Sequence, residues 1–375
     1  MSPAELLVVA VVAVALSVLQ TFPLIAHLGS SMPKDLGDPL YQAWQVAWDG
    51  HALLHQPGHF WQANHSYPLP DSLAFSDALV GYTPAGLIGS GLHAAIVRYN
   101  LLFIFIFALS FFGGWLLARE LNASKAGAWV GGAAFAYSPW HFGQGGHMHV
   151  LSNGGIALAL FLLIRGYRRE SWKLVLAGWL AAAWQLSIGF SLGLQLILAL
   201  AALAAAGVVG WVRSGRPRPA GATVISSALG IAAFGLTAAL LSGPYLRVMH
   251  DYPSSVRGVA VLERTSPNLG AFFAAPATNM VWGDLTAPLR HSFAHFESEK
   301  ALFPGIMILL IAMAGLGYSL WPRKLRAGLG ISVLVLAVLA LGIHGGALGK
   351  LLPYRLLFEF VPGWKGVRTP GRLFD

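Results

Sequence analysis

Runs of about 20 apolar residues recur along this chain, and they constrain its fold more than any other feature of the sequence. A helix of about 20 apolar residues is long enough to cross the hydrocarbon core of a bilayer. Only 10% of the 375 residues are charged, whereas soluble globular proteins carry about 25% charged residues. The sequence therefore predicts an all-α membrane protein that crosses the bilayer several times.

The apolar runs predict a polytopic bundle of about nine transmembrane helices. The expected spans are residues 5–28, 98–118, 126–141, 150–165, 172–189, 191–212, 221–246, 301–321 and 327–345. The first run has no basic segment before it and no obvious cleavage site. We therefore expect it to remain as a helix and not to be removed as a signal peptide.

Basic residues gather in four short loops between the runs, and they predict the topology. Twelve of the 24 Lys and Arg residues lie there: Arg119, Lys125, Arg165, Arg168, Arg169, Lys173, Arg213, Arg216, Arg218, Arg323, Lys324 and Arg326. Cytoplasmic loops of membrane proteins carry an excess of Lys and Arg. These loops and the N-terminus are therefore expected in the cytoplasm. The net charge of +9 then reflects topology, and we expect no nucleic-acid partner.

Acidic residues fall mainly on the opposite face, ten of them in two long outer loops at 29–97 and 247–300 and two, Glu359 and Asp375, in the C-terminal segment. Only Glu5, Glu120 and Glu170 do not follow this pattern. This alternation of basic and acidic loops between the two faces requires that residues 78–97 do not cross the membrane. The segment is apolar and contains four glycines and a proline, so we expect a re-entrant or interfacial piece. The other expected parts of this single polytopic domain (1–375) are a first helix at 1–28, a helical core at 98–246, the last helices at 301–345 and an outer C-terminal segment at 346–375. That last segment has no polar tail, which is typical of a fragment of a longer protein.

Asp38 is the strongest candidate for chemistry in the first outer loop. It lies just beyond the expected first helix, in Gly37-Asp38-Pro39. A carboxylate at this place could act as a general base or orient an acceptor hydroxyl. The alternative is structural, because Asp at an N-cap followed by Pro is a favoured start of a helix.

The segment that follows Asp38 has the spacing of an amphipathic helix over residues 40–54. Its aromatic face contains Tyr41, Trp44, Trp48, His51 and His55. Tryptophans on such a face beside a membrane are typical of a helix that lies in the interface. The four-residue spacing of the histidines resembles metal ligands, but Pro57-Gly58 breaks the helix before His59, so no metal site is predicted. The chain has no cysteine, which excludes disulfides and thiolate sites.

Other acidic residues of the outer loops offer a second carboxylate. Asp77 stands at the start of the 78–97 segment, where it could bind substrate or serve as a first-turn acid favoured by the helix dipole. Glu297 and Glu299 precede the expected helix at 301. Together with Asp38, one of them could form a site between two loops, or it could be an interfacial acid near a helix start.

Three basic or imidazole side chains are candidates for binding phosphate. His147 and His149 lie in a glycine-rich outer loop, and Arg247 ends the expected helix at 221–246. An arginine on the outer face can pair with phosphate as a planar fork. The alternative for Arg247 is a side chain that extends from the bilayer to the interface.

The order of these features resembles the GT-C superfamily of integral-membrane glycosyltransferases. One helix is followed by a large outer loop with an acid at its start, then by many helices and a second large outer loop. The stretches that carry the resemblance are Gly37-Asp38-Pro39 with Trp44 and Trp48, Tyr67-Pro68 with residues 73–77, residues 135–139 with His147, Glu299 before residues 302–305, and Pro362-Gly363 with residues 368–372.

The resemblance implies transfer of a sugar from a polyprenyl-phosphate donor to a glycan, lipid or protein acceptor on the outer face of the plasma membrane. Asp38 would take the place of the family's first-loop catalytic acid, and Glu299 would assist it. Many members have two adjacent acids there, whereas Asp35 lies three residues before Asp38. The remaining residues implied for substrate binding are Asp77, Asp35, His147, His149, Arg247 and Trp44. A divalent cation is left open as a cofactor.

Two other classes of protein remain open at this point. A transporter or flippase for a lipid-linked solute is expected to show inverted halves and charges in mid-helix, and neither is visible in this sequence. A non-catalytic envelope assembly protein on the same fold is also compatible with the pattern. These readings differ in whether Asp38 faces a site that substrate can reach.

Overall fold

The computed structural model describes residues 1–215, 220–255, 258–293, 295–344, 349–361, 364–367 and 369–374. All regular structure in these ranges is helical, and they contain no strand. The expected all-α class is therefore confirmed. The chain divides into two compact units, residues 1–136 with 145–255 and residues 137–144 with 256–375. The single polytopic domain stays a prediction.

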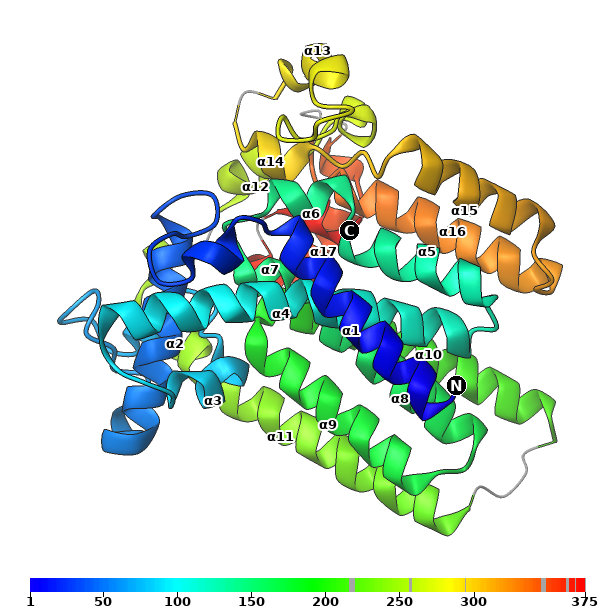
Figure 1. Cartoon of the computed structure of the whole chain (residues 1–375), viewed down its shortest axis with the longest axis horizontal. Coiled ribbons are helices and arrows are strands. Elements are labelled where there is room, and N and C mark those ends of the chain that lie inside the picture. The colour runs from blue at the N-terminus through cyan, green and yellow to red at the C-terminus, as the bar shows by residue number, and fades with distance from the viewer. Residues whose placement is uncertain are drawn as a thin grey trace. The chain divides into compact units, whose positions relative to one another are not determined.

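The first unit is a bundle of long helices with short helical turns between them (Figure 1). Its helices are α1 (Pro3–Gln20), α2 (Asp38–His55), α3 (Thr83–Gly86), α4 (Gly91–Glu120), α5 (Lys125–Ala136), α7 (Met148–Leu151), α8 (Gly154–Arg168), α9 (Trp172–Ile188), α10 (Phe190–Arg213) and α11 (Gly221–Asp251). Helix α9 packs between α8 and α11, and α4 packs on α1, α5 and α8. Helix α2 packs on α3 and α4.

Glycines permit the close packing around α4. A Cβ atom on Gly132 of α5 would lie 2.8 Å from the carbonyl oxygen of Phe111 on α4. A Cβ atom on Gly154 of α8 would lie 2.6 Å from the backbone nitrogen of Ser110 on α4. Small residues are the usual means by which membrane helices bring their backbones together. These two positions therefore fix the spacing of α5 and α8 against α4.

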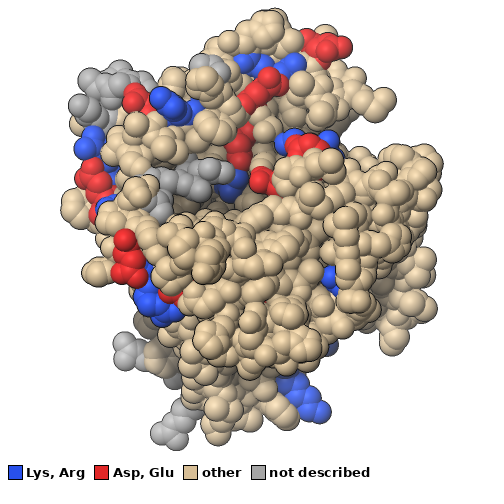
Figure 2. Space-filling model, turned by 90° about the vertical axis from the view of Figure 1, so that its left-hand side faces the viewer, with Lys and Arg blue, Asp and Glu red and all other residues tan. Residues whose placement is uncertain are grey.

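Five helical segments of the described chain are long and apolar enough to cross a membrane. They are Pro3–Gln20, Gly91–Glu120, Met148–Arg168, Phe190–Arg213 and Gly221–Asp251. Their apolar side chains are largely exposed on α1, α10 and α11, and Figure 2 shows a face on which uncharged residues cover most of the surface. This surface indicates a membrane protein. The count of nine spans, the loops and the orientation stay predictions.

The structure shifts several expected boundaries. Residues 78–97 do not form one element, because Val80–Tyr82 is a short turn, α3 follows, and residues 91–97 are the first two turns of α4. Glycines at positive φ, Gly89 (72°) and Gly91 (78°), separate α3 from α4. The expected run at 126–141 ends earlier, since Ser138 caps a new short helix.

Ion pairs involve two of the three acids that are predicted to lie on the cytoplasmic face. Glu120 at the end of α4 accepts from Arg165 at 2.8 Å and from Arg168 at 3.4 Å. Glu5 lies 3.9 Å from Arg119. These acids are neutralised by the basic loops that predicted the topology. Arg216 and Arg218 of the same prediction lie outside the described residues.

The second unit consists of shorter helices. They are α6 (Pro139–Gly143), α12 (Val259–Thr265), α13 (Ala287–Arg290), α14 (Glu297–Lys300), α15 (Ile306–Tyr318), α16 (Arg323–Ala340) and α17 (Tyr354–Phe360). Helices α15 and α16 pack on each other, and a short turn at Pro370–Leu373 is buried. Pro362, Gly363, Arg368 and Asp375, which belong to the predicted C-terminal segment, lie outside the described residues.

Candidate functional site

Asp38 is the first residue of α2, and the structure corrects the expectation that it caps this helix. The N-cap is Gly37, whose backbone N–H donates to Asp35 Oδ1 at 2.8 Å. Asp35 therefore makes a local turn of the kind that Asp side chains favour. The Asp38 carboxylate instead lies 2.9 Å from Nε2 of His147. The Asp38 side chain is 55% exposed, whereas His147 is 15% exposed.

Gln42, one turn after Asp38, holds the histidine loop against α2. Its Oε1 accepts from the backbone N–H of Met148 at 2.9 Å, and its Nε2 lies 3.1 Å from Nδ1 of His149. Because Oε1 is taken by a donor, Nε2 must be the donor to His149, and Nδ1 must accept. This assigns His149 as the neutral tautomer with its proton on Nε2. That Nε2 is the atom that faces Asp77, at 3.8 Å.

Asp77 caps a helix that is distant from it in sequence. Its Oδ1 accepts from the backbone N–H of Phe190, the first residue of α10, at 2.5 Å. The N-cap of α10 is Gly189, which has no side chain to satisfy this donor. A carboxylate at a helix N-terminus is favoured by the helix dipole. The first-turn role expected for Asp77 in its own segment is therefore played at α10 instead.

The backbone on both sides of Asp77 is fixed by hydrogen bonds. Tyr245 on α11 accepts from the N–H of Ala78 and donates to the carbonyl of Ser76, each at 3.0 Å. Gln45 on α2 donates to the carbonyl of Asp77 itself at 2.9 Å. The Asp77 segment is thus held between α2 and α11.

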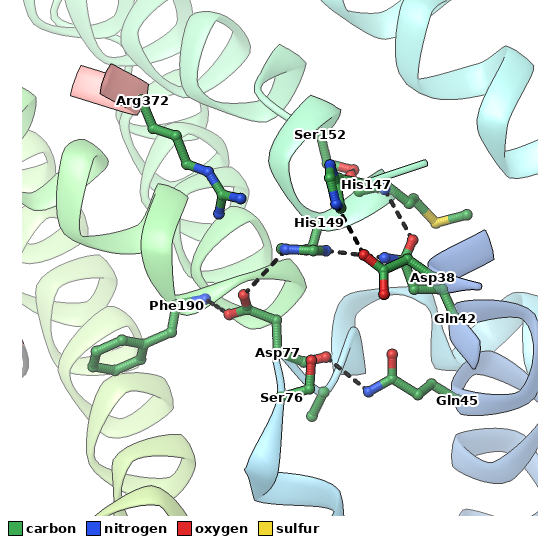
Figure 3. A network of polar contacts seen from close by, with 12 residues as sticks. Asp38, Gln42, Gln45, Ser76, Asp77, His147, His149, Ser152, Phe190 and Arg372 are labelled. Atoms are coloured by element: carbon green, nitrogen blue, oxygen red, sulfur yellow. Dashed lines mark hydrogen bonds and ion pairs between the residues drawn. The ribbon is translucent and has the colours of Figure 1, made fainter. Parts of the chain in front are cut away.

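Two carboxylate–imidazole pairs lie side by side in the first unit (Figure 3). One pair is Asp38 with His147, and the other is Asp77 with His149. The two imidazole rings meet edge to face with centroids 5.9 Å apart, and Gln42 joins α2 to the second ring. The arrangement can accept a proton at Asp38 while His147 orients the carboxylate.

The aromatic face predicted for α2 is a continuous row of ring contacts. Trp44 stacks on Tyr41 and Trp48 with centroids 5.5 and 6.2 Å apart, and His65 meets it edge-on at 5.0 Å. The row continues through His51 to His55. Burial, with a smaller effect of the Asp38 carboxylate, raises the pKa of Tyr41 to about 12. Tyr41 therefore keeps its proton. Its hydroxyl oxygen lies 3.3 Å from His65 Nε2.

Arg247 pairs with a carboxylate that the sequence did not single out. Its Nε and Nη2 donate to Asp71 Oδ2 and Oδ1 at 2.7 and 3.0 Å. Asp71 precedes the Asp77 segment, so α11 holds this stretch of chain at Asp71 and again at residues 76–78. The structure thus brings Arg247 to Asp71, while its predicted contact with phosphate stays a prediction.

Glu299 belongs to the second unit, where it forms a buried ion pair. Arg372 donates through Nε to Glu299 Oε2 at 3.1 Å and through Nη2 to Oε1. Both side chains are less than 10% exposed. The neighbouring Lys300 is also buried, and burial lowers its pKa. A shared site of Glu299 with Asp38 stays a prediction.

The sequence also contains a signal for the polar face of α2. Asp38, Gln42, Gln45 and Asp49 are spaced four, three and four residues apart, which places all four on one face of α2. No such spacing indicates the hydrogen bonds of Tyr245, Asp71 and Arg372, because each of these bonds joins segments far apart in the chain.

The site offers no ready-made metal centre in the part of the chain that the structure describes. No three His, Asp or Glu side chains gather there as ligands for an ion. Comparisons of the chain with known protein families, with curated proteins and with solved structures find no match. A function is therefore argued from the geometry of the two pairs and from the apolar helices.

Proposed function

We propose that this chain is an integral-membrane glycosyltransferase of the GT-C type. It would move a sugar from a polyprenyl-phosphate donor to an acceptor on the non-cytoplasmic face of the plasma membrane. The observation that carries the proposal is the Asp38–His147 pair, in which a half-exposed carboxylate is held by an imidazole at 2.9 Å. It lies in the loop region that follows the first apolar helix.

Asp38 has the properties that a general base needs. One carboxylate oxygen is held by His147, so the side chain is oriented, and its exposure leaves it accessible to an incoming hydroxyl. It is not the N-cap of its own helix, since that position belongs to Gly37. This supports a role in which the carboxylate accepts a proton.

The proposed step is a displacement at the anomeric carbon of the donor sugar. The acceptor hydroxyl forms a new C–O bond to that carbon, and its proton passes to Asp38. The bond between the carbon and the phosphate oxygen breaks, and the polyprenyl phosphate leaves with the electron pair. Charge develops on this phosphate, which a nearby cation would stabilise.

Arg247 is the candidate for that cation. Its bonds to Asp71 use two of its five N–H groups, and its side chain is 57% exposed. A guanidinium that is already oriented by one carboxylate can present its other edge to a phosphate. His149 is committed to Gln42 and Asp77, so we assign it to positioning the second pair.

The first unit also offers an apolar route for the prenyl chain. Helix α11 exposes leucine and isoleucine side chains along its length. A small pocket lies between α11, the start of α10 and the Asp77 segment, and its lining includes Val80, Phe190, Leu241 and Tyr245. A lipid-linked donor approaching along α11 would therefore meet the polar site at its end.

The test is sugar transfer in membranes that contain the full chain. We would supply a mixture of labelled polyprenyl-phosphate sugars to the wild type and to Asp38→Asn, with and without a chelator. We expect transfer by the wild type and a loss of about 100- to 10,000-fold in the variant, the usual contribution of a general base. Asp251→Asn, an exposed carboxylate at the end of α11, is the matched control.

Absence of transfer by folded wild-type protein with every donor would overturn the proposal. Uptake or flipping of the labelled donor in that case would favour the transporter reading. The chelator arm separates metal-dependent from metal-independent transfer.

A further inference from the structure

One face of α2 carries a row of carboxyl and amide side chains that runs from the surface to the interior. Asp38 at its outer end is 55% exposed, whereas Gln42, Gln45 and Asp49 are buried. Gln42 bonds the histidine loop, and Gln45 bonds the carbonyl of Asp77. Asp49, at the inner end, is the one member of the row for which no bond to another segment has been described.

Asp49 is fully buried, and its carboxyl group has no donor among the described residues. Both of its carboxylate oxygens are without a hydrogen-bond partner, and so is Oε1 of Gln45. The row therefore ends in three buried acceptor atoms on two side chains that are one helical turn apart. A charged carboxylate in such a place is strongly disfavoured, and the group is expected to take up a proton instead. Burial accordingly raises the pKa of Asp49 well above its ordinary value.

Asp49 is 0% exposed, and the residues beside it in α2 are closely packed. The next residue, Gly50, lies directly against α3, and a Cβ atom there would be 2.2 Å from the carbonyl of Gly86. Trp48 and Ala52 on the same helix belong to a buried apolar cluster with Leu73 and Ala78. A proton on Asp49 itself is thus the simplest donor for this site.

We propose that Asp49 is a neutral carboxylic acid that donates its O–H to Gln45 Oε1 and thereby acts as a positioning residue for Asp77. Side chains at i and i+4 on a helix are neighbours and can form such a bond. With Oε1 held by Asp49, the Gln45 amide keeps Nε2 directed at the Asp77 carbonyl, where it donates at 2.9 Å. The inference concerns the geometry of the site and does not depend on sugar transfer.

The protonation state can be tested by infrared spectroscopy of the full chain in lipid nanodiscs at neutral pH. Aspartate labelled with carbon-13 identifies the C=O stretch of any protonated aspartic acid. We expect this band in the wild type, its loss in Asp49→Asn, and its retention in Asp251→Asn, where an exposed carboxylate is removed. In Gln45→Leu the band should move toward that of a carboxylic acid without an acceptor. A wild type without the band, or a band that survives in Asp49→Asn, would overturn the proposal.

The positioning role can be tested by hydrogen exchange at two amides beside Asp77. The amide of Phe190 donates to Asp77 Oδ1, and the amide of Ala78 donates to Tyr245. Asp49→Asn retains a donor for Gln45, so exchange at both amides should stay within about twofold of the wild type. Asp49→Leu removes the donor, and exchange should become about tenfold faster.

Equal acceleration by the two substitutions would show that only packing matters, and no acceleration by either would show that Gln45 needs no partner. Either result contradicts the positioning role. If Asp49→Leu does not fold, Asp49→Ala gives the same test, since it removes the donor to Gln45 without adding a larger side chain. Both experiments read the structure alone, so they can succeed where the proposed transferase activity fails.

Discussion

The Asp38–His147 and Asp77–His149 pairs are built from the same two residue types, but their surroundings differ. Asp38 is 55% exposed, stands 2.9 Å from its histidine and caps no helix. Asp77 is 17% exposed, stands 3.8 Å from its histidine and holds the first N–H of α10. A carboxylate beside a histidine is therefore a candidate for chemistry only when its oxygens do not already bond to the backbone of the fold.

The His147→Gln substitution tests the exposed pair from its imidazole side, and we expect its effect on transfer to be second only to that of Asp38→Asn. Hydrogen bonds to charged groups contribute about 1.5–3 kcal/mol, so kcat/KM for transfer should fall about 10- to 100-fold. His149→Gln should leave more activity, because His149 does not touch Asp38. The comparison fails if the two variants lose transfer equally while both remain folded.

Substitutions of Asp77 test whether the buried pair is structural. Asp77→Ala removes the acceptor for the N–H of Phe190 and should lower the free energy of unfolding by about 1–2 kcal/mol, the usual value of a lost helix cap. Asp77→Asn retains a side-chain oxygen and should lose less. Thermal unfolding followed by tryptophan fluorescence measures both, and equal losses would show that the charge and not the cap matters.

Asp49 is a third carboxylate, farther along α2, and its burial predicts that the stability of the fold depends on pH. Its pKa in the folded chain is raised above the ordinary value of 3.8. The folded state therefore keeps a proton that the unfolded state loses, so stability is highest below that value and falls as the pH rises. Asp49→Asn carries no such loss. Its stability relative to the wild type should increase from pH 4 to pH 7, and a constant difference across this range would contradict the assignment.

Arg247→Lys should have the smallest effect on stability. The pair with Asp71 is more than half exposed on the arginine side, and exposed ion pairs contribute at most about 1 kcal/mol. Lysine cannot reproduce the two-bonded fork, so transfer should be affected more than unfolding. Parallel measurement of Tm and kcat separates the two, and a large fall in Tm alone would assign Arg247 to the fold.

The elements that come from local periodicity could be predicted from the sequence. The apolar runs gave the all-α class, and the spacing of Tyr41, Trp44 and Trp48 gave one face of α2, which the ring contacts confirm. The prediction that Asp38 could be the N-cap of α2 was wrong, because the N-cap is Gly37. The polar face of the same helix was readable by the same periodicity.

The partners of the candidate residues could not be predicted, because each is supplied by a distant segment. Nothing near Asp77 in sequence indicates that it caps α10, and nothing near Glu299 indicates Arg372. Residues 78–97 were expected as one piece because the sequence is apolar throughout, but two glycines at positive φ separate its parts. Such turns depend on tertiary packing more than on composition.

The most direct test compares transfer by Asp38→Asn and Asp77→Asn in one assay, with each rate divided by the amount of folded protein. Both substitutions remove one negative charge and conserve shape, so they differ only in which pair they change. Our account predicts that Asp38→Asn loses about 100-fold or more, while Asp77→Asn retains most of the rate. A wild-type rate in Asp38→Asn, or the larger loss in Asp77→Asn, would contradict the assignment of the reacting centre to Asp38.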